Sequence, residues 1–170
     1  VAPLITRALA APFVDVGAGS LAPFSIWFWA VIGTGFSHMA LLSVARPAFA
    51  ATSGRAILWS GVLATTLWIG GPGMMLSSNI AFYHEPVAVA FGLTGIALWL
   101  WSRVLQTGRI GPWVLAGLAL CAAVMVHARP HLAIAMYAGV GIAALQALRA
   151  SRAKALLPVA FALASLGAGG

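Results

Sequence analysis

The chain has 170 residues, of which 62% are hydrophobic and only 6% are charged, and its mean hydropathy is +1.03. A soluble globular domain is about half apolar and about a quarter charged, so this composition excludes an ordinary soluble domain and indicates an integral membrane protein. The net charge of +7 comes from basic residues scattered singly between apolar runs. We therefore expect membrane lipid, and no nucleic acid, as a partner.

The apolar runs are long enough to cross a ~30 Å hydrocarbon layer, and both faces of each run are apolar, which favours helices over a β-barrel. The sequence predicts an all-α, polytopic transmembrane bundle of about six to seven hydrophobic helices. After a short helix at 3–14, the expected spans are 23–45, 56–76, 86–103, 112–128, 131–148 and one from 155. Pro72 follows two glycines inside one run, which predicts a bend or an early end there.

We interpret residues 1–170 as a single transmembrane domain. The chain opens on Val1 without a methionine and stops within the apolar run "ALLPVAFALASLGAGG", so we expect a fragment of a longer polytopic protein. Cys121 is the only cysteine, which excludes a disulfide or a cysteine-based metal site. No metal-ligand spacing is found, and neither a catalytic residue nor a cofactor is assigned.

The basic residues predict the orientation of the bundle. Seven of the nine lie in three loops, 46–55, 103–111 and 149–154, which alternate with loops poor in basic residues. The positive-inside rule places these three loops in the cytoplasm, and we expect a bacterial cytoplasmic (inner) membrane. Asp15, the turn at 83–85 and the segment at 127–131 then lie on the exoplasmic side.

The turn Tyr83-His84-Glu85 is one of two polar clusters on that side. Glu85 precedes Pro86 and therefore starts a helix, where a carboxylate is favoured by unpaired N–H groups. It is either a capping carboxylate or, with Tyr83 and His84, part of a site that binds a hydroxylated or cationic substrate or shuttles a proton. Position alone leaves both interpretations open.

The second polar cluster is "HARPH", residues 127–131. Pro130 breaks the helix, so the side chains of His127, Arg129 and His131 are expected to converge near a helix N-terminus, an arrangement that suits a phosphate. Arg129 could instead extend to lipid headgroups, or pair with Glu85 across the bundle in a purely structural role.

Two further features are interpreted as structural. His38 lies in the middle of a span, and we expect it to be packed between helices near Gly33 and Gly35. Most of the seven tryptophans, Trp29 and Trp101 among them, lie near predicted span ends and are interpreted as an aromatic belt.

Three stretches together resemble the central part of bacterial C-type superfamily membrane glycosyltransferases, the dolichyl-phosphate-mannose mannosyltransferase-like (family 39-like) group. They are "VAPLITRALAAPFV", "GPGMMLSSNIAFYHEP" and "WVLAGLALCAAVMVHARPHLAI". The resemblance implies transfer of a sugar from a polyprenyl-phosphate donor to an exoplasmic acceptor. It places the turn at 83–85 beside the acceptor or the donor head, and Arg129 against the lipid-linked phosphate.

The same resemblance places the catalytic carboxylate in a loop that would precede Val1, so Asp15 takes no catalytic role. Two other classes remain open. A secondary transporter would use Glu85, His84 and His38 as a path and the break at 70–73 as a discontinuous helix. A non-catalytic scaffold subunit would need Arg129 and Glu85 only as a structural pair.

Overall fold

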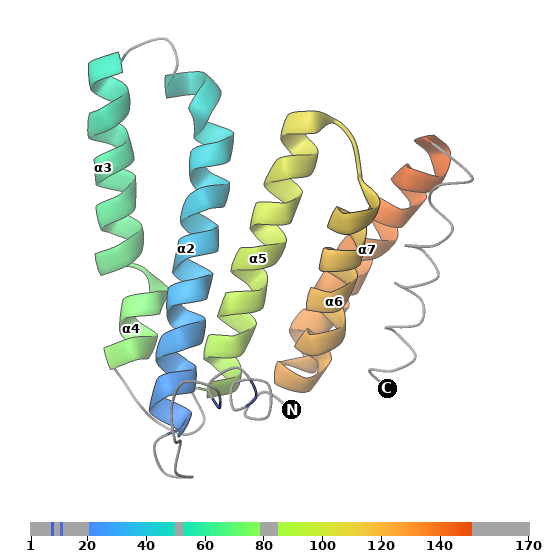
Figure 1. The fold of residues 1–170 in the computed structure, drawn as a ribbon, viewed down its shortest axis with the longest axis horizontal. Coiled ribbons are helices and arrows are strands. Elements are labelled where there is room, and N and C mark those ends of the chain that lie inside the picture. The colour runs from blue at the N-terminus through green and yellow to red at the C-terminus, as the bar shows by residue number, and fades with distance from the viewer. Residues whose placement is uncertain (1–7, 9–10, 12–20, 50–52, 79–84, 151–170) are drawn as a thin grey trace.

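The computed structural model describes residues 8, 11, 21–49, 53–78 and 85–150. Within the ranges 21–49, 53–78 and 85–150 the chain is helical and has no strand, as the sequence predicted. The helices are α2 (Leu21–Phe49), α3 (Ser53–Ile69), α4 (Pro72–Ser78), α5 (Glu85–Thr107), α6 (Pro112–Ala128) and α7 (Pro130–Ala150) (Figure 1). Of the predicted helix at 3–14 only residues 8 and 11 are described, and the predicted span from 155 lies outside the described residues.

Three of these helices are long and apolar enough to cross a membrane, which supports an integral membrane protein. The candidate spans are Ala22–Ala45, Glu85–Thr107 and Pro130–Arg149. The predicted six to seven spans are not supported. One reason is that α6 has 17 residues and is only about 25 Å long, shorter than a typical hydrocarbon layer. The other is that the predicted span at 56–76 is two helices.

The break in that span lies where the sequence predicted it. Helix α3 ends at Ile69, two glycines follow, and α4 begins at Pro72. The Gly70 N–H donates to the Thr66 carbonyl over 3.0 Å, and the next backbone bond runs from the Met74 N–H to the Gly71 carbonyl over 3.2 Å. Because Pro72 has no N–H to continue the α3 ladder, the chain turns and starts a new seven-residue helix.

The return of the chain through α3 and α4 makes α2 and α5 parallel neighbours (Figure 1). Helices α5, α6 and α7 then follow one another in alternating directions. The aromatic rings of Phe36 and Trp99 lie 5.4 Å apart, and near the far end Gln106 donates to the Ser43 carbonyl over 2.7 Å. In both contacts the residue of α5 is 63 positions after its partner in α2, so the two helices keep the same register between these points.

Glycines let α2 and α5 approach closely. A methyl group on Gly95 would lie 2.5 Å from the Gly33 carbonyl oxygen, and one on Gly92 would lie 2.5 Å from the Trp29 ring. Trp29 is 6% exposed and packs in the core, so its assignment to an aromatic belt was wrong. The predicted role of Gly33 in close packing is confirmed, whereas a methyl group on Gly35 would have no neighbour within 4 Å.

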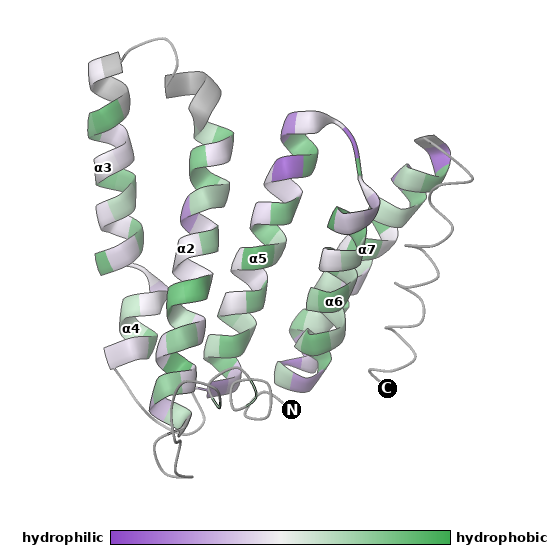
Figure 2. Ribbon diagram, viewed as in Figure 1, coloured by the Kyte–Doolittle hydropathy of each residue, from purple (hydrophilic) through white to green (hydrophobic). Residues whose placement is uncertain are grey.

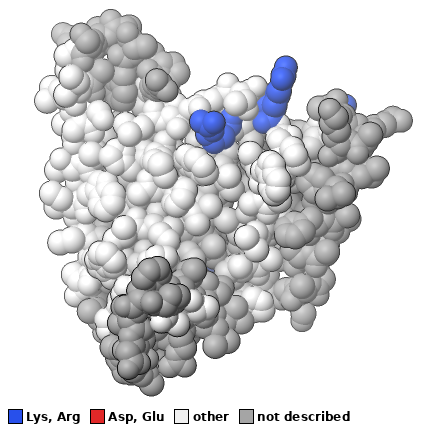
Figure 3. Space-filling model, in the orientation of Figure 1, with Lys and Arg blue, Asp and Glu red and all other residues white. Residues whose placement is uncertain are grey.

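The two ends of the bundle differ in polarity. Exposed Arg103 and Arg109 lie where α5 ends and α6 begins, and Figure 3 shows basic side chains gathered at this end. The start of α5 and the α6–α7 turn lie at the opposite end (Figure 1). In Figure 2 the hydrophilic residues are concentrated at these two ends and the helices between them are mostly hydrophobic. The alternation of loops inferred from the basic residues thus agrees with the fold.

Candidate functional site

The α6–α7 turn brings Arg129 out of the helical ladder. Arg129 has extended backbone angles, φ −150° and ψ 92°, and its N–H donates to the Met125 carbonyl over 2.8 Å, which closes α6. Its own carbonyl accepts the N–H groups of Leu132 (3.0 Å) and Ala133 (3.1 Å), which opens α7. Pro130 follows as the first residue of α7, where its missing N–H costs nothing. One extended residue therefore ends one helix and caps the next.

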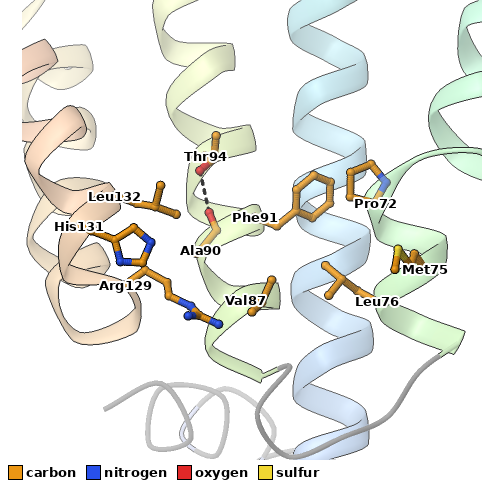
Figure 4. Close-up of a pocket in the computed structure, with 10 residues that line it drawn as sticks. All are labelled: Pro72, Met75, Leu76, Val87, Ala90, Phe91, Thr94, Arg129, His131 and Leu132. Carbon is orange, nitrogen blue, oxygen red and sulfur yellow. Dashed lines mark hydrogen bonds between the residues drawn. The ribbon is translucent and has the colours of Figure 1, made fainter.

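A cavity of about 700 Å³ lies beside this turn, between α4, α5 and α7. Its lining is apolar apart from one hydroxyl, one guanidinium and one imidazole, and consists of Pro72, Met75, Leu76, Val87, Ala90, Phe91, Thr94, Arg129, His131 and Leu132 (Figure 4). The hydroxyl of Thr94 donates to the Ala90 carbonyl of its own helix over 2.8 Å. Arg129 and His131 therefore supply the polar groups that a ligand would meet.

The guanidinium of Arg129 is the charged group of this cavity. Its side chain is half-buried and extends toward the first turns of α5, near Val87 (Figure 4). Within the described ranges, no hydrogen bond or ion pair engages the guanidinium. An arginine that is partly withdrawn from water and unpaired attracts an anion, because its five N–H donors remain available.

Three basic side chains were predicted to converge, and two of them, Arg129 and His131, lie together at the cavity. His131 lines the cavity beside Arg129 and is exposed, so its imidazole is accessible from outside. His127, in the last turn of α6, is also exposed but does not line the cavity. A ligand in the cavity thus meets one guanidinium and one imidazole.

The N-terminus of α7 contributes less than the sequence predicted. Pro130 has no N–H, and the N–H groups of Leu132 and Ala133 already donate to the Arg129 carbonyl. Of the first four residues of α7, only His131 therefore has an N–H that can be offered to an anion. An anion at this site would be held mainly by side chains rather than by a ring of backbone donors.

Glu85 faces a different direction from the cavity. It lies three residues before Ala88 and seven before Gly92 on α5, which places it on the face that packs against α2. Its side chain is 4% exposed, and its Oε1 atom is buried without a hydrogen-bond partner in the described ranges. Glu85 is not among the residues lining the cavity, and no ion pair joins it to Arg129 in the part of the chain that the structure describes. The structural pair considered from the sequence is therefore not formed.

The role of the turn at 83–85 stays a prediction. Tyr83 and His84 lie outside the described residues. What the structure adds is a buried carboxylate at the same end of the bundle as the cavity. Leaving a carboxylate oxygen buried and unpaired is costly, so Glu85 is poised to accept a hydrogen bond.

His38 joins two helices, as the sequence analysis predicted. Its Nδ1 atom accepts a hydrogen bond of 3.0 Å from the Trp68 indole N–H, which connects α2 to α3. Because Nδ1 is the acceptor, the neutral ring carries its proton on Nε2, and this buried atom has no partner among the described residues. His38 thus takes part in packing, apart from the cavity.

His38 and Glu85 are also far apart along the bundle axis. The register of 63 positions between α2 and α5 places Glu85 level with Ala22. His38 lies 16 residues further along α2, which is about 24 Å at 1.5 Å per residue. These two residues therefore do not belong to one site.

The described residues contain no group of three or more His, Cys, Asp or Glu side chains that could hold a metal ion. Comparisons of the chain with models of protein families, with curated proteins and with solved structures found no match. The function is therefore argued from the cavity and its chemistry.

Proposed function

We propose that this chain is part of an integral membrane glycosyltransferase of a bacterial cytoplasmic membrane. It moves a sugar from a polyprenyl-phosphate donor to an acceptor on the exoplasmic side, and the cavity between α4, α5 and α7 holds the donor phosphate. The observation that carries the proposal is the guanidinium of Arg129, which has no partner among the described residues, beside the His131 imidazole in an otherwise apolar cavity.

Such a donor has a phosphate head and a hydrocarbon chain, and the cavity has a polar wall for the first and an apolar wall for the second. A guanidinium presents paired N–H groups at the spacing of two phosphate oxygens, and an adjacent imidazole adds a further donor. The carbons next to the phosphate would contact Val87, Phe91 and Leu132, which line the same cavity. A water-soluble anion would gain nothing from these apolar walls, so the lining favours an amphiphile.

The position of the site near the end of the bundle supports a lipid head as its ligand. The α6–α7 turn is at the end of the bundle, where helix ends meet the lipid headgroup region (Figure 1). In this proposal Glu85, with Tyr83 and His84, takes part in binding the acceptor or the sugar, as the resemblance of the sequence implies. Glu85 then acts from the α2 side of α5, separately from the phosphate contact.

A transporter is the second candidate, because the α3–α4 break contributes to the cavity. Pro72, Met75 and Leu76 of α4 form part of the lining, and broken helices often surround transporter substrates. Against it, Glu85 and His38 are separated by about 24 Å along the bundle, so they would not exchange a proton directly. A transport assay of the complete protein decides between the two, because only a transporter moves substrate without transferring sugar.

The proposed phosphate contact is tested in the complete protein with the variant Arg129→Lys, which keeps the charge and loses the paired donors. We expect donor affinity to fall about tenfold or more, since a charge-assisted pair contributes about 1.5–3 kcal/mol. Arg109→Lys is the matched control, because Arg109 is exposed at the opposite end of the bundle and its substitution should leave donor binding unchanged.

The measurements are binding of a polyprenyl-phosphate sugar in nanodiscs and transfer of a radiolabelled sugar. Parental binding and turnover in both Arg129→Lys and Arg129→Ala would refute the proposed phosphate site. Replacement of His131 by Ala should have a smaller effect on binding than Arg129→Ala, because an imidazole offers fewer N–H donors than the five of a guanidinium.

A further inference from the structure

The turn between α5 and α6 is fixed by its own hydrogen bonds. The Gly108 N–H donates to the Val104 carbonyl over 2.8 Å, and Gly108 has φ 62°, the left-handed conformation with which many helices end. The Thr107 hydroxyl donates to the carbonyls of Arg103 (2.8 Å) and Arg109 (3.2 Å), and the Arg109 N–H donates to the same hydroxyl over 3.4 Å. One side chain therefore holds the backbones of two arginines next to each other.

The charges of these two arginines have no partner among the described residues. The side chains of Arg103 and Arg109 are exposed, and no hydrogen bond or ion pair engages them within the described ranges. Glu85, the acidic residue in the part of the chain that the structure describes, is buried at the opposite end of the bundle (Figure 1). Two exposed guanidiniums on one turn, at the end where Figure 3 shows basic side chains, therefore form a site for an anion.

The lengths of α5 and α6 place this turn near lipid headgroups. Along α5, Arg103 lies about 27 Å from Glu85, and α6, with 17 residues, is about 25 Å long. The hydrocarbon layer is about 30 Å thick, so with the start of α5 and the end of α6 at one boundary, Arg103 and the start of α6 lie just inside the other. Cations that flank a short helix extend to the lipid phosphates. Both guanidiniums are therefore within reach of the phosphate layer.

An exposed aromatic side chain follows the two arginines. Trp113, in the first turn of α6 and four residues after Arg109, is 88% exposed. An indole at the end of a membrane helix lies at the headgroup level, with its apolar ring against the upper part of the acyl chains. Guanidiniums beside such an indole suit a lipid with an anionic head better than free phosphate, which would gain nothing from Trp113.

We propose that the α5–α6 turn binds the headgroup of an anionic phospholipid, with Arg103 and Arg109 on its phosphate and Trp113 against its acyl chains. Charge complementarity selects this partner, because anionic lipids attract basic side chains beside a membrane and basic sites between helix ends hold their headgroups. A zwitterionic lipid is bound more weakly, since its own ammonium group is repelled by the arginines. The site lies at the opposite end of the bundle from the cavity of Arg129 and is independent of the proposed function.

The test is native mass spectrometry of the complete, delipidated protein with phosphatidylglycerol or with phosphatidylcholine of the same acyl chains. We expect the parent to bind phosphatidylglycerol more tightly. Arg103→Gln and Arg109→Gln should each weaken its binding about fivefold and leave phosphatidylcholine binding unchanged, because one cation near the membrane surface contributes about that factor. Arg149→Gln is the matched control and should have no effect. Arg149 is also exposed, in the last turn of α7 at the same end of the bundle, and its substitution removes the same charge.

Two further measurements separate the geometry of the turn from its charge. Thr107→Val keeps every charge and removes the hydroxyl that joins the two arginines, so phosphatidylglycerol binding should weaken about twofold or more. In the parent, a phosphatidylglycerol with a photoreactive diazirine next to its glycerol should label residues 103–113. This label tests the site without any substitution, and therefore also covers the case in which a variant fails to fold.

Four results would overturn the proposal. They are equal binding of the two lipids by the parent, displacement of phosphatidylglycerol by inorganic phosphate, a loss in Arg149→Gln as large as in Arg109→Gln, and parental affinity in Thr107→Val. An equal loss in Arg149→Gln would indicate diffuse attraction by the whole basic end instead of a site at this turn. None of these results depends on donor binding at Arg129, so a failure here and a failure of the proposed function are distinguishable.

Discussion

The parallel packing of α2 and α5 gives a sharp prediction at Gly95. In the variant Gly95→Ala the new methyl group would lie 2.5 Å from the Gly33 carbonyl oxygen and 3.0 Å from the Gly33 Cα atom. Both are backbone atoms, so no side-chain rotation relieves the contact. Since ordinary contact needs about 3.5 Å, the two helices must separate by about 1 Å near this point.

The expected cost follows from this geometry. Overpacking a close interface costs about 1–3 kcal/mol, and a clash with backbone belongs at the upper end of that range. Alanine regains about 1 kcal/mol over glycine as a helix former, which leaves a net loss of about 2 kcal/mol in the free energy of unfolding. At Gly35 a methyl group has no neighbour within 4 Å, so Gly35→Ala should keep the helix-propensity gain of about 1 kcal/mol.

The assay is the free energy of unfolding of the two variants and the parent, measured by steric trapping in bicelles. The variants should differ by about 3 kcal/mol, with the parent between them. The reasoning would be refuted if Gly95→Ala were as stable as Gly35→Ala, because α2 and α5 would then not pack in the register that the structure shows.

Further predictions concern the α2–α3 contact and the orientation of the bundle. Trp68→Phe should lower the free energy of unfolding by about 1 kcal/mol, because it removes the 3.0 Å hydrogen bond to His38, as measured by the same assay. His38→Asn should lower stability modestly and leave turnover of the complete protein measurable, and loss of turnover with normal membrane insertion would place His38 in the mechanism. In a Cys121→Ala background, a cysteine at position 109 should be labelled by an impermeant thiol reagent from the cytoplasmic side only, and one at position 131 from the outside only; the opposite pattern would reverse the orientation.

Much of the fold was predictable because the prolines and glycines that end helices can be recognised from the local sequence. Pro72 among glycines and Pro130 after Arg129 end helices through the missing N–H, and both breaks lie where the sequence places them. The number of spans was not predictable in the same way. Apolar composition alone does not tell a run that crosses the membrane from one that breaks midway, such as α3 and α4.

The candidate site was predictable in part. The sequence singled out Arg129 and His131, because charged and imidazole side chains are rare in this chain, but it did not show that Glu85 faces α2. Trp101 and Gly139 were missed as residues lining a second cavity, of about 260 Å³, between α5, α6 and α7, and Trp101 was assigned to an aromatic belt. In a membrane helix the faces toward lipid and toward neighbouring helices are both apolar, so hydropathy carries no contrast between them. The spacing of Thr94, Leu98 and Trp101 places them on one face of α5, and this spacing is the sequence signal that could have identified the lining residues.

The shared direction of α2, α5 and α7 has an electrostatic consequence. All three helices end at the side of the basic loops, so the negative ends of their macrodipoles lie together there (Figure 1). Arg149 is in the last turn of α7, and Arg109 lies two residues beyond the end of α5. Each such cation can stabilise a helix terminus by about 0.3–1 kcal/mol. The charges from which the cytoplasmic side was predicted are therefore also placed to stabilise the helix ends beside them.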